Sequence, residues 1–457
     1  MKTIQCVARY FPDRCGGIQT HLSELMPIMQ DRGVESKVAA SDDQAQEQTY
    51  DYAGVEVYRY PVYPRPKEEP THGMFPHGGF EKFATWLRGQ KADIYHQHQW
   101  TTKCGLPHLR LAKELGMTTL VSIRLPQPIC QRRTLMLYGK EVCDGKIDIV
   151  RCSYCCDELT RKLPASVVRG LSQVPLSILQ QIPMPESTYA PTAIPGTKGL
   201  LLRPLAVPAF VAARQDGLQA MAKYADCIFV MCEWLYEMLV LNGIPEEKLA
   251  LCTHGIANVF KENAAQYQKA TLKPEGVPLR VGFLGRWDRV KGVHVLIDAM
   301  RSLPTDVPIE LIIHGVPQDE SYRQRAIARI ADDPRIKVKP RLTRDEVPGA
   351  IAGFDVLAIP SQWLETGPVV VLEAHALGVP VIGSDLGGIA EKVAHGVDGL
   401  LVPASDISAW ADTFARLATD VNLLNTLRQG IGSVRTISME ADDTIAIYQK
   451  VIERRDR

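Results

Sequence analysis

The stretch PSQWLETGPVVVLEAHALGVPVIGSDLGGIAE, residues 360–391, decides the fold. It starts at the end of the apolar run DVLAIPS, which predicts a buried strand, and continues through a polar loop into an apolar helix. Pro368 suits the first position of this helix, and Gly378 with Pro380 suits its end. The helix therefore begins at the carboxyl end of a parallel strand, where open α/β sheets bind ligands and free N–H groups favour an anion.

This helix carries a carboxylate where its sequence predicts burial. Residues 369–372 (VVVL) are apolar on every side, as in a buried helix, yet Glu373 follows them directly. A buried carboxylate without donors is energetically expensive, so Glu373 needs hydrogen-bond partners. The hydroxyl groups of a ligand could supply them, and so could an internal arginine or an exposed edge. On physical grounds alone both interpretations stay open.

The alternation of strand and helix extends over most of the chain. In the first half the β-branched runs are TIQCVARY, ESKVAAS, VEVYRY, DIYHQH, TTLVSIRL, CIFVMC and LALCTHG. In the second half they are LRVGFLG, IELIIHG, IKVKPR, DVLAIPS, PVIGSD and GLLVP. Helical patterns such as THLSELMPIMQDRG and GVHVLIDAMRSLP lie between them. This order predicts an α/β protein with parallel sheets that are covered by helices on both faces.

Three breaks in the alternation divide the chain. The segment 130–156 is rich in cysteine, the segment 183–208 is rich in proline and predicts irregular chain, and 261–279 is polar. We therefore predict a Rossmann-like N-terminal domain over residues 1–262 with inserts at about 130–208, a linker over 263–278, a Rossmann-like C-terminal domain over 279–438 and a closing helix over 439–457.

Composition excludes several classes of protein. The 457 residues include 52 basic and 52 acidic side chains, and this zero net charge argues against a nucleic-acid partner. The first residues lack the apolar core of a signal peptide, and no apolar run reaches the ~18 residues of a membrane helix. Eleven cysteines without a secretion signal indicate reduced thiols. We expect a cytoplasmic protein of open oligomeric state.

Residues 160–183 leave a membrane contact open. Basic residues come first in this segment and apolar residues follow, so it could lie on the inner face of a membrane as a peripheral contact. The favoured interpretation is an ordinary packed insert.

Two further clusters suit a phosphorylated ligand. In LRVGFLGRWDRVKG, the cations Arg286 and Lys291 follow a strand that ends near Gly285, and a guanidinium fork with an ammonium suits a diphosphate. Gly16 and Gly17 follow the first strand and open a helix, so backbone could approach a phosphate or sugar there, although a plain tight turn explains them equally well.

Taken together, these motifs resemble the signature of glycosyltransferase family 4, the group 1 glycosyltransferases. The shared features are the E-x7-E pair Glu365 and Glu373, the G-x-P-V-I segment at 378–382, and Gly387-Gly388 followed by Glu391. GRWDRVKG, GGIQTHL and DIYHQH resemble further family motifs. The resemblance implies the GT-B fold, with two facing Rossmann-like domains and a C-terminal helix that crosses back to the N-terminal domain.

The resemblance also implies an activity. It implies a retaining, metal-independent transferase of the hexosyltransferase type (EC 2.4), which moves a sugar from a UDP- or GDP-sugar to a glycan, lipid-linked or small-molecule acceptor. Polysaccharide or glycoconjugate biosynthesis is the implied setting, and no cofactor is implied beyond the nucleotide-sugar donor. A nucleotide-sugar epimerase or a phosphorylase of the same fold fits these motifs less well.

The family's roles fall on matching positions of this sequence. Glu365 would orient the donor sugar, and Arg286 with Lys291 would hold the diphosphate and stabilise the leaving group. Glu373 would accept the ribose hydroxyls of the nucleotide. Backbone amides would complete the diphosphate cradle. They come from Gly16 and Gly17 and from the segment Gly367, Pro368 and Val369.

One position departs from the family pattern. Arg124 stands in TTLVSIRLPQPIC where many relatives have a histidine near the donor sugar. Arginine stays charged and cannot act as a base, though it could bind an anionic acceptor. An alternative is therefore a catalytically silent nucleotide-binding or scaffold protein. His21 and His98 are further candidates for the cleft without an assigned role.

The cysteine-rich segment raises a second question. Cys152 and Cys155 form a C-x2-C pair, with Cys143 and Cys130 upstream, which could be a structural zinc site. The spacing is looser than in standard zinc motifs, so reduced cysteines that pack an insert are the favoured interpretation. No catalytic metal is expected.

Overall fold

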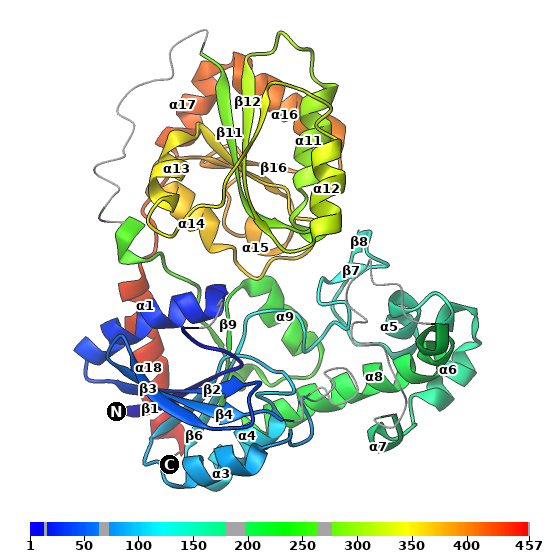
Figure 1. The fold of residues 1–457 in the computed structure, drawn as a ribbon, viewed down its shortest axis with the longest axis vertical. Coiled ribbons are helices and arrows are strands. Elements are labelled where there is room, and N and C mark those ends of the chain that lie inside the picture. The colour runs from blue at the N-terminus through cyan, green and yellow to red at the C-terminus, as the bar shows by residue number, and fades with distance from the viewer. Residues whose placement is uncertain (13–15, 64–72, 180–196, 261, 263–276, 456–457) are drawn as a thin grey trace. The chain divides into compact units, whose positions relative to one another are not determined.

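The structure, a computed structural model, describes residues 1–12, 16–63, 73–179, 197–260, 262 and 277–455. The chain divides into two compact units, of which unit 1 comprises Met1–Thr253 with Ala441–Arg457 and unit 2 comprises His254–Glu440. Each unit is built on a mainly parallel sheet covered by helices (Figure 1). The predicted class, two α/β domains with parallel sheets, is confirmed. Most of the predicted linker and residues 183–196 of the proline-rich segment lie outside the described residues.

The sheet of unit 1 has eight strands in the order β10-β9-β6-β5-β1-β2-β4-β3. Its strands are β1 (Lys2–Val7), β2 (Glu35–Asp42), β3 (Gln48–Tyr52), β4 (Val55–Pro61), β5 (Ile94–Gln97), β6 (Thr118–Ile123), β9 (Cys227–Val230) and β10 (Leu249–Leu251). All pairings are parallel except that of β3 with β4. The sequence did not predict β3, since QTYDY is polar and lies at the edge of the sheet.

Helices of unit 1 follow the strands in the expected manner. They are α1 (Gly17–Asp31), α3 (Phe80–Arg88), α4 (Leu106–Glu114), α9 (Glu233–Leu241) and the 3-10 turn η2 (Glu246–Lys248). The predicted closing helix is α18 (Ile437–Arg455), whose residues from Ala441 onward belong to unit 1. Its Tyr448 is fully buried and lies 2.6 Å from Nδ1 of His96 on β5. The last helix therefore returns to the first unit, as the fold class requires.

An insert between β6 and β9 occupies one end of unit 1 (Figure 1). It contains the hairpin β7 (Met136–Leu137) and β8 (Glu141–Val142), then α5 (Ile149–Cys156), η1 (Thr160–Lys162), α6 (Ala165–Leu171), α7 (Leu176–Leu179) and α8 (Thr197–Tyr224). Helices α5, α6 and α7 all pack against α8. Among the described residues, no helix combines the length and the apolar character needed to cross a membrane.

The expectation of irregular chain up to residue 208 was wrong from Thr197 onward. Helix α8 continues through Pro204 and Pro208. Each internal proline removes one helical hydrogen bond and crowds the preceding turn. Burial of Ala206, Ala209 and Phe210 opposes this cost, because it removes apolar surface from water on the packed side of the helix.

The sheet of unit 2 has the strand order of a Rossmann fold. Its strands are β11 (Leu279–Trp287), β12 (Ile309–Pro317), β13 (Ile336–Lys339), β14 (Val356–Ile359), β15 (Val381–Ser384) and β16 (Gly399–Val402). They lie in the order β13-β12-β11-β14-β15-β16 and every pairing is parallel. The chain thus builds outward from β11 in one direction, then restarts beside β11 with β14 and builds the other way.

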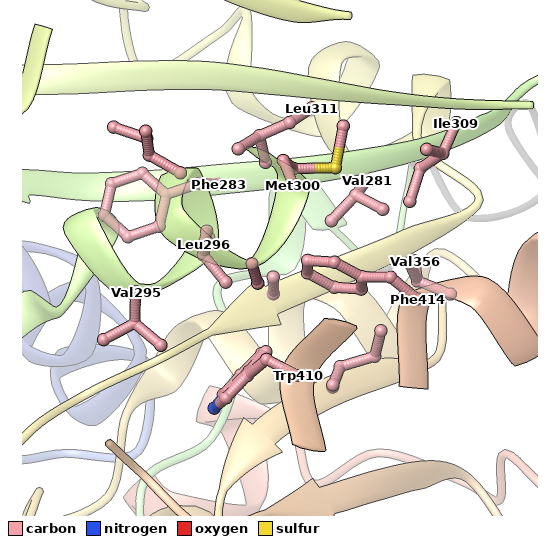
Figure 2. Close-up of a cluster of buried hydrophobic side chains, with 14 of the residues drawn as sticks. Val281, Phe283, Val295, Leu296, Met300, Ile309, Leu311, Val356, Trp410 and Phe414 are labelled. Atoms are coloured by element: carbon pink, nitrogen blue, oxygen red, sulfur yellow. The ribbon is translucent and has the colours of Figure 1, made fainter. Parts of the chain in front are cut away.

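Helices cover both faces of this sheet. They are the 3-10 turn η3 (Arg289–Lys291), α11 (Val293–Ser302), α12 (Glu320–Ala328), α13 (Val347–Gly353), α14 (Val369–Ala376), α15 (Gly387–Ala390), α16 (Ile407–Thr419) and α17 (Val421–Gln429). On one face, Val281 and Phe283 of β11 pack with Trp410 and Phe414 of α16 (Figure 2). The other face packs against α13 and α14. Alternate residues of β11 thus serve different cores, as strand geometry requires.

Phe414 tests the core of unit 2. Replacing this fully buried ring by alanine should lower the free energy of unfolding of unit 2 by about 3–5 kcal/mol, because a cavity remains. Ile407 on the same helix is 38% exposed, so Ile407→Ala should cost no more than about 1 kcal/mol. Urea denaturation of both variants measures the difference. Equal losses in the two variants would contradict this packing.

Candidate functional site

The predicted donor residues gather where the strand order of unit 2 reverses. Arg286 lies at the end of β11 and Lys291 lies in η3, just beyond that strand. Glu365 follows β14, which pairs with β11. In doubly wound sheets this reversal leaves a crevice at the carboxyl ends of the two neighbouring strands, because their connections run to opposite sides. Motifs that lie far apart in the sequence therefore meet at the position where such folds bind ligands.

Lys291 and Glu365 form a buried ion pair at this position. Nζ of Lys291 lies 2.5 Å from Oε1 of Glu365, and the two side chains are 23% and 9% exposed. The same carboxylate oxygen accepts hydrogen bonds from Ser361 Oγ at 2.7 Å and from Trp363 Nε1 at 2.9 Å. Nζ of Lys291 also lies 5.8 Å from the centre of the Trp363 ring. These partners hold both charges in one arrangement.

The partners of Glu365 set its charge. Burial of the carboxyl acts to raise its pKa, but the charge of Lys291 and the hydrogen bonds from Lys291, Ser361 and Trp363 outweigh burial, so the pKa lies below the usual value. Glu365 is therefore ionised at neutral pH. A lysine ammonium has three N–H donors, and Glu365 accounts for one hydrogen bond of Lys291 among the described residues. The remaining donors suit an anionic oxygen.

Backbone contacts fasten the two loops to each other. The N–H of Gln362 donates to Val290 O at 2.7 Å, directly before Lys291. Gly292 has a φ of +72°, and a Cβ there would lie 1.8 Å from Pro360 O, so only glycine allows this approach. From the other side, the N–H of Gly388 donates to Glu365 O at 2.7 Å. The loops after β11, β14 and β15 thus form one fixed structure.

Glu373 is buried, as predicted, and it has a protein partner. Nη1 of Arg344 lies 3.2 Å from Oε1 of Glu373, and the carboxylate side chain is 10% exposed. An arginine therefore pairs with Glu373, although it is not the internal arginine that was one of the predicted alternatives. The Arg344 side chain remains 42% exposed. This pair leaves open whether Glu373 also receives hydroxyl donors from a ligand.

The start of α14 differs in detail from the expectation. Pro368 is the N-cap residue with φ −66° and ψ 116°, and the helix begins at Val369, one residue later than predicted. Its extended ψ places proline before the helix, which loses no hydrogen bond there. Gly367 has a φ of +110° and turns the chain into the helix. The helix ends as predicted, with Gly378 at φ +70°.

Burial along α14 is also less complete than predicted. Val371 and Glu373 are buried, whereas Val369, Val370 and Leu372 are half-buried. The helix packs one side against the sheet and keeps the rest partly accessible. The apolar sequence of α14 therefore predicted more burial than the structure shows.

Arg286 stands apart from the ion pair. Its side chain is 44% exposed, and its Nη2 lies 4.0 Å from Asp288 Oδ2. An exposed pair at this distance contributes little energy, so the guanidinium is free to reorient toward a ligand. Arg286 lies near the end of β11 and Lys291 lies just beyond that strand. The two cations therefore border the same edge of the sheet.

Unit 1 has its own switch point, between β1 and β5. Gly16 and Gly17 lie at the start of α1, which follows β1, and both are exposed. The N–H of Gly16 donates to Gln19 Oε1 at 3.1 Å, so the first turn is partly capped by its own side chain. His21 lies one turn further along α1 and is buried.

A pocket of about 330 Å³ lies beside these elements in unit 1. Its walls include Ile18 of α1, His98 and Trp100 after β5, and Ser122 with Arg124 at the end of β6. The structure thus brings two of the three uncertain cleft residues, His98 and Arg124, to one pocket. It lies at the carboxyl ends of the strands that flank the switch point, where ligands bind in such sheets.

His98 has a buried ring nitrogen without a hydrogen-bond partner among the described residues. Its Nε2 lies 2.6 Å from Gln5 Oε1, and the amide of Gln5 in turn donates to Thr3 Oγ1 at 2.8 Å. Nε2 therefore carries the proton, and among the described residues Nδ1 of His98 has no partner. Burial, with the charges of His96, Arg124 and His21, holds the pKa of His98 well below its usual value. A neutral imidazole of this tautomer can accept a hydrogen bond from a hydroxyl group.

Sequence analysis missed several residues that build the donor site. Ser361, Gln362 and Trp363 stand inside the quoted stretch, but nothing in their spacing separated them from loop residues. Arg344 follows β13 in a polar segment with several cations, and no pattern distinguishes it. Its role follows only from the fold, which brings the loop after β13 to α14.

The two sheets and their switch-point sites define a class of protein: two Rossmann-like units of the GT-B architecture. Family models agree with this class, since one described as "Glycosyl transferases group 1" matches residues 265–431 and one described as "Glycosyl transferase 4-like domain" matches residues 16–147. The chain belongs to the group 1 glycosyltransferases, glycosyltransferase family 4.

Curated relatives agree with the family. The chain is similar to D-inositol 3-phosphate glycosyltransferases from Corynebacterium urealyticum, at 36% identity over 156 residues, and Corynebacterium efficiens, at 36% over 187 residues. The matched segments cover 32% and 38% of this chain. They span 37% and 42% of those relatives, less than half of their length.

Solved structures agree with the fold. Sucrose-phosphate synthase from Thermosynechococcus elongatus is similar with a TM-score of 0.64 at 16% identity, over 99% of each chain. HepE from Anabaena, in complex with UDP and glucose, is similar with a TM-score of 0.57 at 15% identity, over 100% of this chain and 99% of that one. At this identity the likeness concerns the fold.

The Lys291–Glu365 pair should respond to mutation as a buried pair does. Lys291→Met should lower the unfolding free energy of unit 2 by about 3–5 kcal/mol at pH 7, since Glu365 stays buried without its counter-charge. Adding Glu365→Gln should recover most of this loss. Loss of Lys291 raises the folded-state pKa of Glu365, so the deficit of the single variant should shrink as the pH falls from about 7 toward about 5.

Urea denaturation at several pH values measures these effects. Lys337→Met is the matched control, because Lys337 pairs with Glu310 at the surface with 41% and 29% exposed side chains and should change stability by no more than about 1 kcal/mol. If the single and double variants lost the same stability, independent of pH, the buried ion pair would not be the stabilising contact described.

Proposed function

We propose that this chain is a retaining glycosyltransferase that transfers a sugar from a nucleotide-diphosphate sugar without a catalytic metal. The observation that carries the proposal is the Lys291–Glu365 pair at the switch point of unit 2, beside the start of α14. A lysine held in place and the N–H groups of a helix start at such a crevice suit a diphosphate. The family membership and the UDP named with HepE support a nucleotide donor.

In this proposal each donor residue acts on a different part of the ligand. Lys291 and Arg286 bind the diphosphate and stabilise the charge that develops on it as the glycosidic bond breaks. Glu365 holds Lys291 in place and orients the donor sugar. Glu373 accepts the ribose hydroxyls and also pairs with Arg344. The backbone N–H groups at the start of α14 complete the phosphate site of unit 2.

The acceptor occupies the pocket of unit 1 in this proposal. His98 lines this pocket as a neutral imidazole, and Trp100 offers an apolar wall. The guanidinium of Arg124 binds an anionic group, such as a phosphate, for which its planar fork is suited. Relatives named for inositol 3-phosphate support an acceptor of this kind. Polysaccharide or glycoconjugate assembly remains the proposed setting, with a cytoplasmic location.

Arg124 also supports a second candidate, a silent protein that binds nucleotide without transfer. Arginine cannot take a proton as the usual histidine could. The predicted donor residues favour the enzyme, because a silent pocket has no need of a half-buried lysine and two buried carboxylates. Turnover decides between the two.

Donor turnover tests the main proposal. Purified full-length protein should release nucleotide from one sugar of a UDP-, GDP- and ADP-sugar panel, with the same rate in EDTA. Glu373→Gln and Arg286→Ala should each reduce turnover by at least about 10²-fold, because they remove ribose or diphosphate contacts. Arg323→Ala, which alters an exposed pair on α12, should leave it unchanged.

Two results would count against this donor site. Nucleotide binding without release from any donor, even with crude acceptor extract, would favour the silent protein. Full turnover in Glu373→Gln would mean that the ribose does not bind at Glu373 on α14. NMR of the product adds a check on stereochemistry, since a product of inverted anomeric configuration would exclude the retaining course.

Arg124→Ala tests the acceptor half separately. It should lower transfer to an acceptor extract by at least about tenfold, because it removes a charge-assisted contact, while the nucleotide Kd stays the same. Phosphatase treatment of the extract should abolish transfer by the unmodified protein. Arg110→Ala, which alters the exposed pair with Glu114, is the control. Unchanged transfer in Arg124→Ala, or an acceptor indifferent to phosphatase, would contradict this role.

A further inference from the structure

Five cysteines of the insert line one pocket outside the transfer site, namely Cys156 and four others. Cys130 lies before the β7–β8 hairpin, Cys143 lies directly after it, and Cys152 and Cys155 lie on α5. All four line a pocket of about 380 Å³, and all are free thiols. Cys152 and Cys155 are three residues apart on a helix, so they share a face. Three separate segments of the insert thus direct sulfur to a common space.

Backbone N–H groups point at two of these sulfurs. The N–H of Tyr138 lies 3.1 Å from Sγ of Cys155, and that of Asp148 lies 3.5 Å from Sγ of Cys152. A neutral thiol gains little from such donors, whereas a thiolate is stabilised by them. Hydrogen bonds from outside the coordination shell also orient metal ligands.

Nearby cations and the shortness of the β7–β8 hairpin also favour a metal site here. Arg132, Lys146 and Arg151 border the same pocket and favour negatively charged sulfur. The hairpin has strands of two residues each, too short to be stable on its own. A small substructure of this kind usually needs a disulfide or a metal to hold it together.

We propose that Cys130, Cys143, Cys152 and Cys155 bind a structural zinc ion that holds the hairpin against α5. Tetrahedral coordination by four thiolates closes the site and leaves no position for substrate, so the ion has no part in transfer. In the described part of the chain no three of these sulfurs lie within 4.8 Å of one another, so the thiols draw together when the ion binds. Binding releases the thiol protons, and such coupling of metal binding to local folding is typical of small zinc modules.

A short chain segment connects the proposed zinc site to the pocket that Arg124 lines in unit 1. The N–H of Cys130 donates to Pro126 O at 2.8 Å, and Gln127 and Pro128 line that pocket with Arg124. Zinc therefore fixes the end of the segment that forms one wall of the pocket. This consequence rests on the proposed function, whereas zinc binding itself does not.

Metal content of the full-length protein tests the site directly. Protein purified under reducing conditions from zinc-supplemented cells should contain one zinc per chain by mass spectrometry. Cys143→Ser and Cys152→Ser should each reduce this content at least about fivefold, because a three-thiolate site binds zinc more weakly. Cys156→Ser should retain zinc, since Cys156 lines the same pocket but is not among the four ligands. Cys232→Ser, at the N-cap of α9, is the control outside the cluster.

Cobalt gives a readout that needs no variant to fold. Replacement of zinc by Co²⁺ should produce thiolate-to-metal charge-transfer absorption and the visible bands of a tetrahedral ion. Chelation should make the insert more sensitive to protease, and zinc should restore its resistance. Protein without zinc, zinc that persists in both Cys143→Ser and Cys152→Ser, or zinc lost in Cys156→Ser would each overturn the proposed ligand set. These outcomes do not depend on donor turnover, so they separate this proposal from the transferase proposal.

Discussion

The ion pair of Lys291 with Glu365 joins the two chain connections that leave the centre of the second sheet in opposite directions. Without this pair, the loop after β14 would hold the buried carboxylate of Glu365 without the opposite charge that the turn after β11 supplies. The carboxylate gains donors from Ser361 and Trp363, and the loops gain the contact of Gln362 with Val290. Gly292 and Gly388 allow the backbones to approach closely enough for these bonds. A binding edge with fixed charges follows from this arrangement.

The two units solve the problem of buried polar groups in different ways. In unit 2 the charges pair with each other, Lys291 with Glu365 and Arg344 with Glu373. In unit 1 the buried His96 and His98 are kept uncharged by burial and are joined to Ser122, Gln5 and Tyr448 by hydrogen bonds, and Arg124 is the charged residue beside them. Charge on one side suits a nucleotide diphosphate, and a hydroxyl-binding edge with one arginine suits a sugar-bearing acceptor.

Most strands, and the loops that carry Lys291 and Glu365, could be predicted from sequence because they depend on local patterns. Buried parallel strands need β-branched runs, and the turns around Lys291 and Glu365 need the glycines and prolines that mark them. The partner of Glu373 could not be predicted, because Arg344 reaches α14 only through the order of the strands. Strand β3 was missed because an edge strand needs no apolar run. Helix α8 was missed because burial by α5 and α6 stabilises a helix that its prolines alone argue against.

The central claim is that a nucleotide diphosphate binds at the edge of unit 2 marked by Lys291 and the start of α14. A crystal structure of the full-length protein with a nucleoside diphosphate tests it most directly. The account predicts diphosphate oxygens within hydrogen-bond distance of Lys291 and Arg286, with ribose hydroxyls on the Glu373 carboxylate. A nucleotide bound away from this edge, or with its ribose remote from Glu373, would contradict the account.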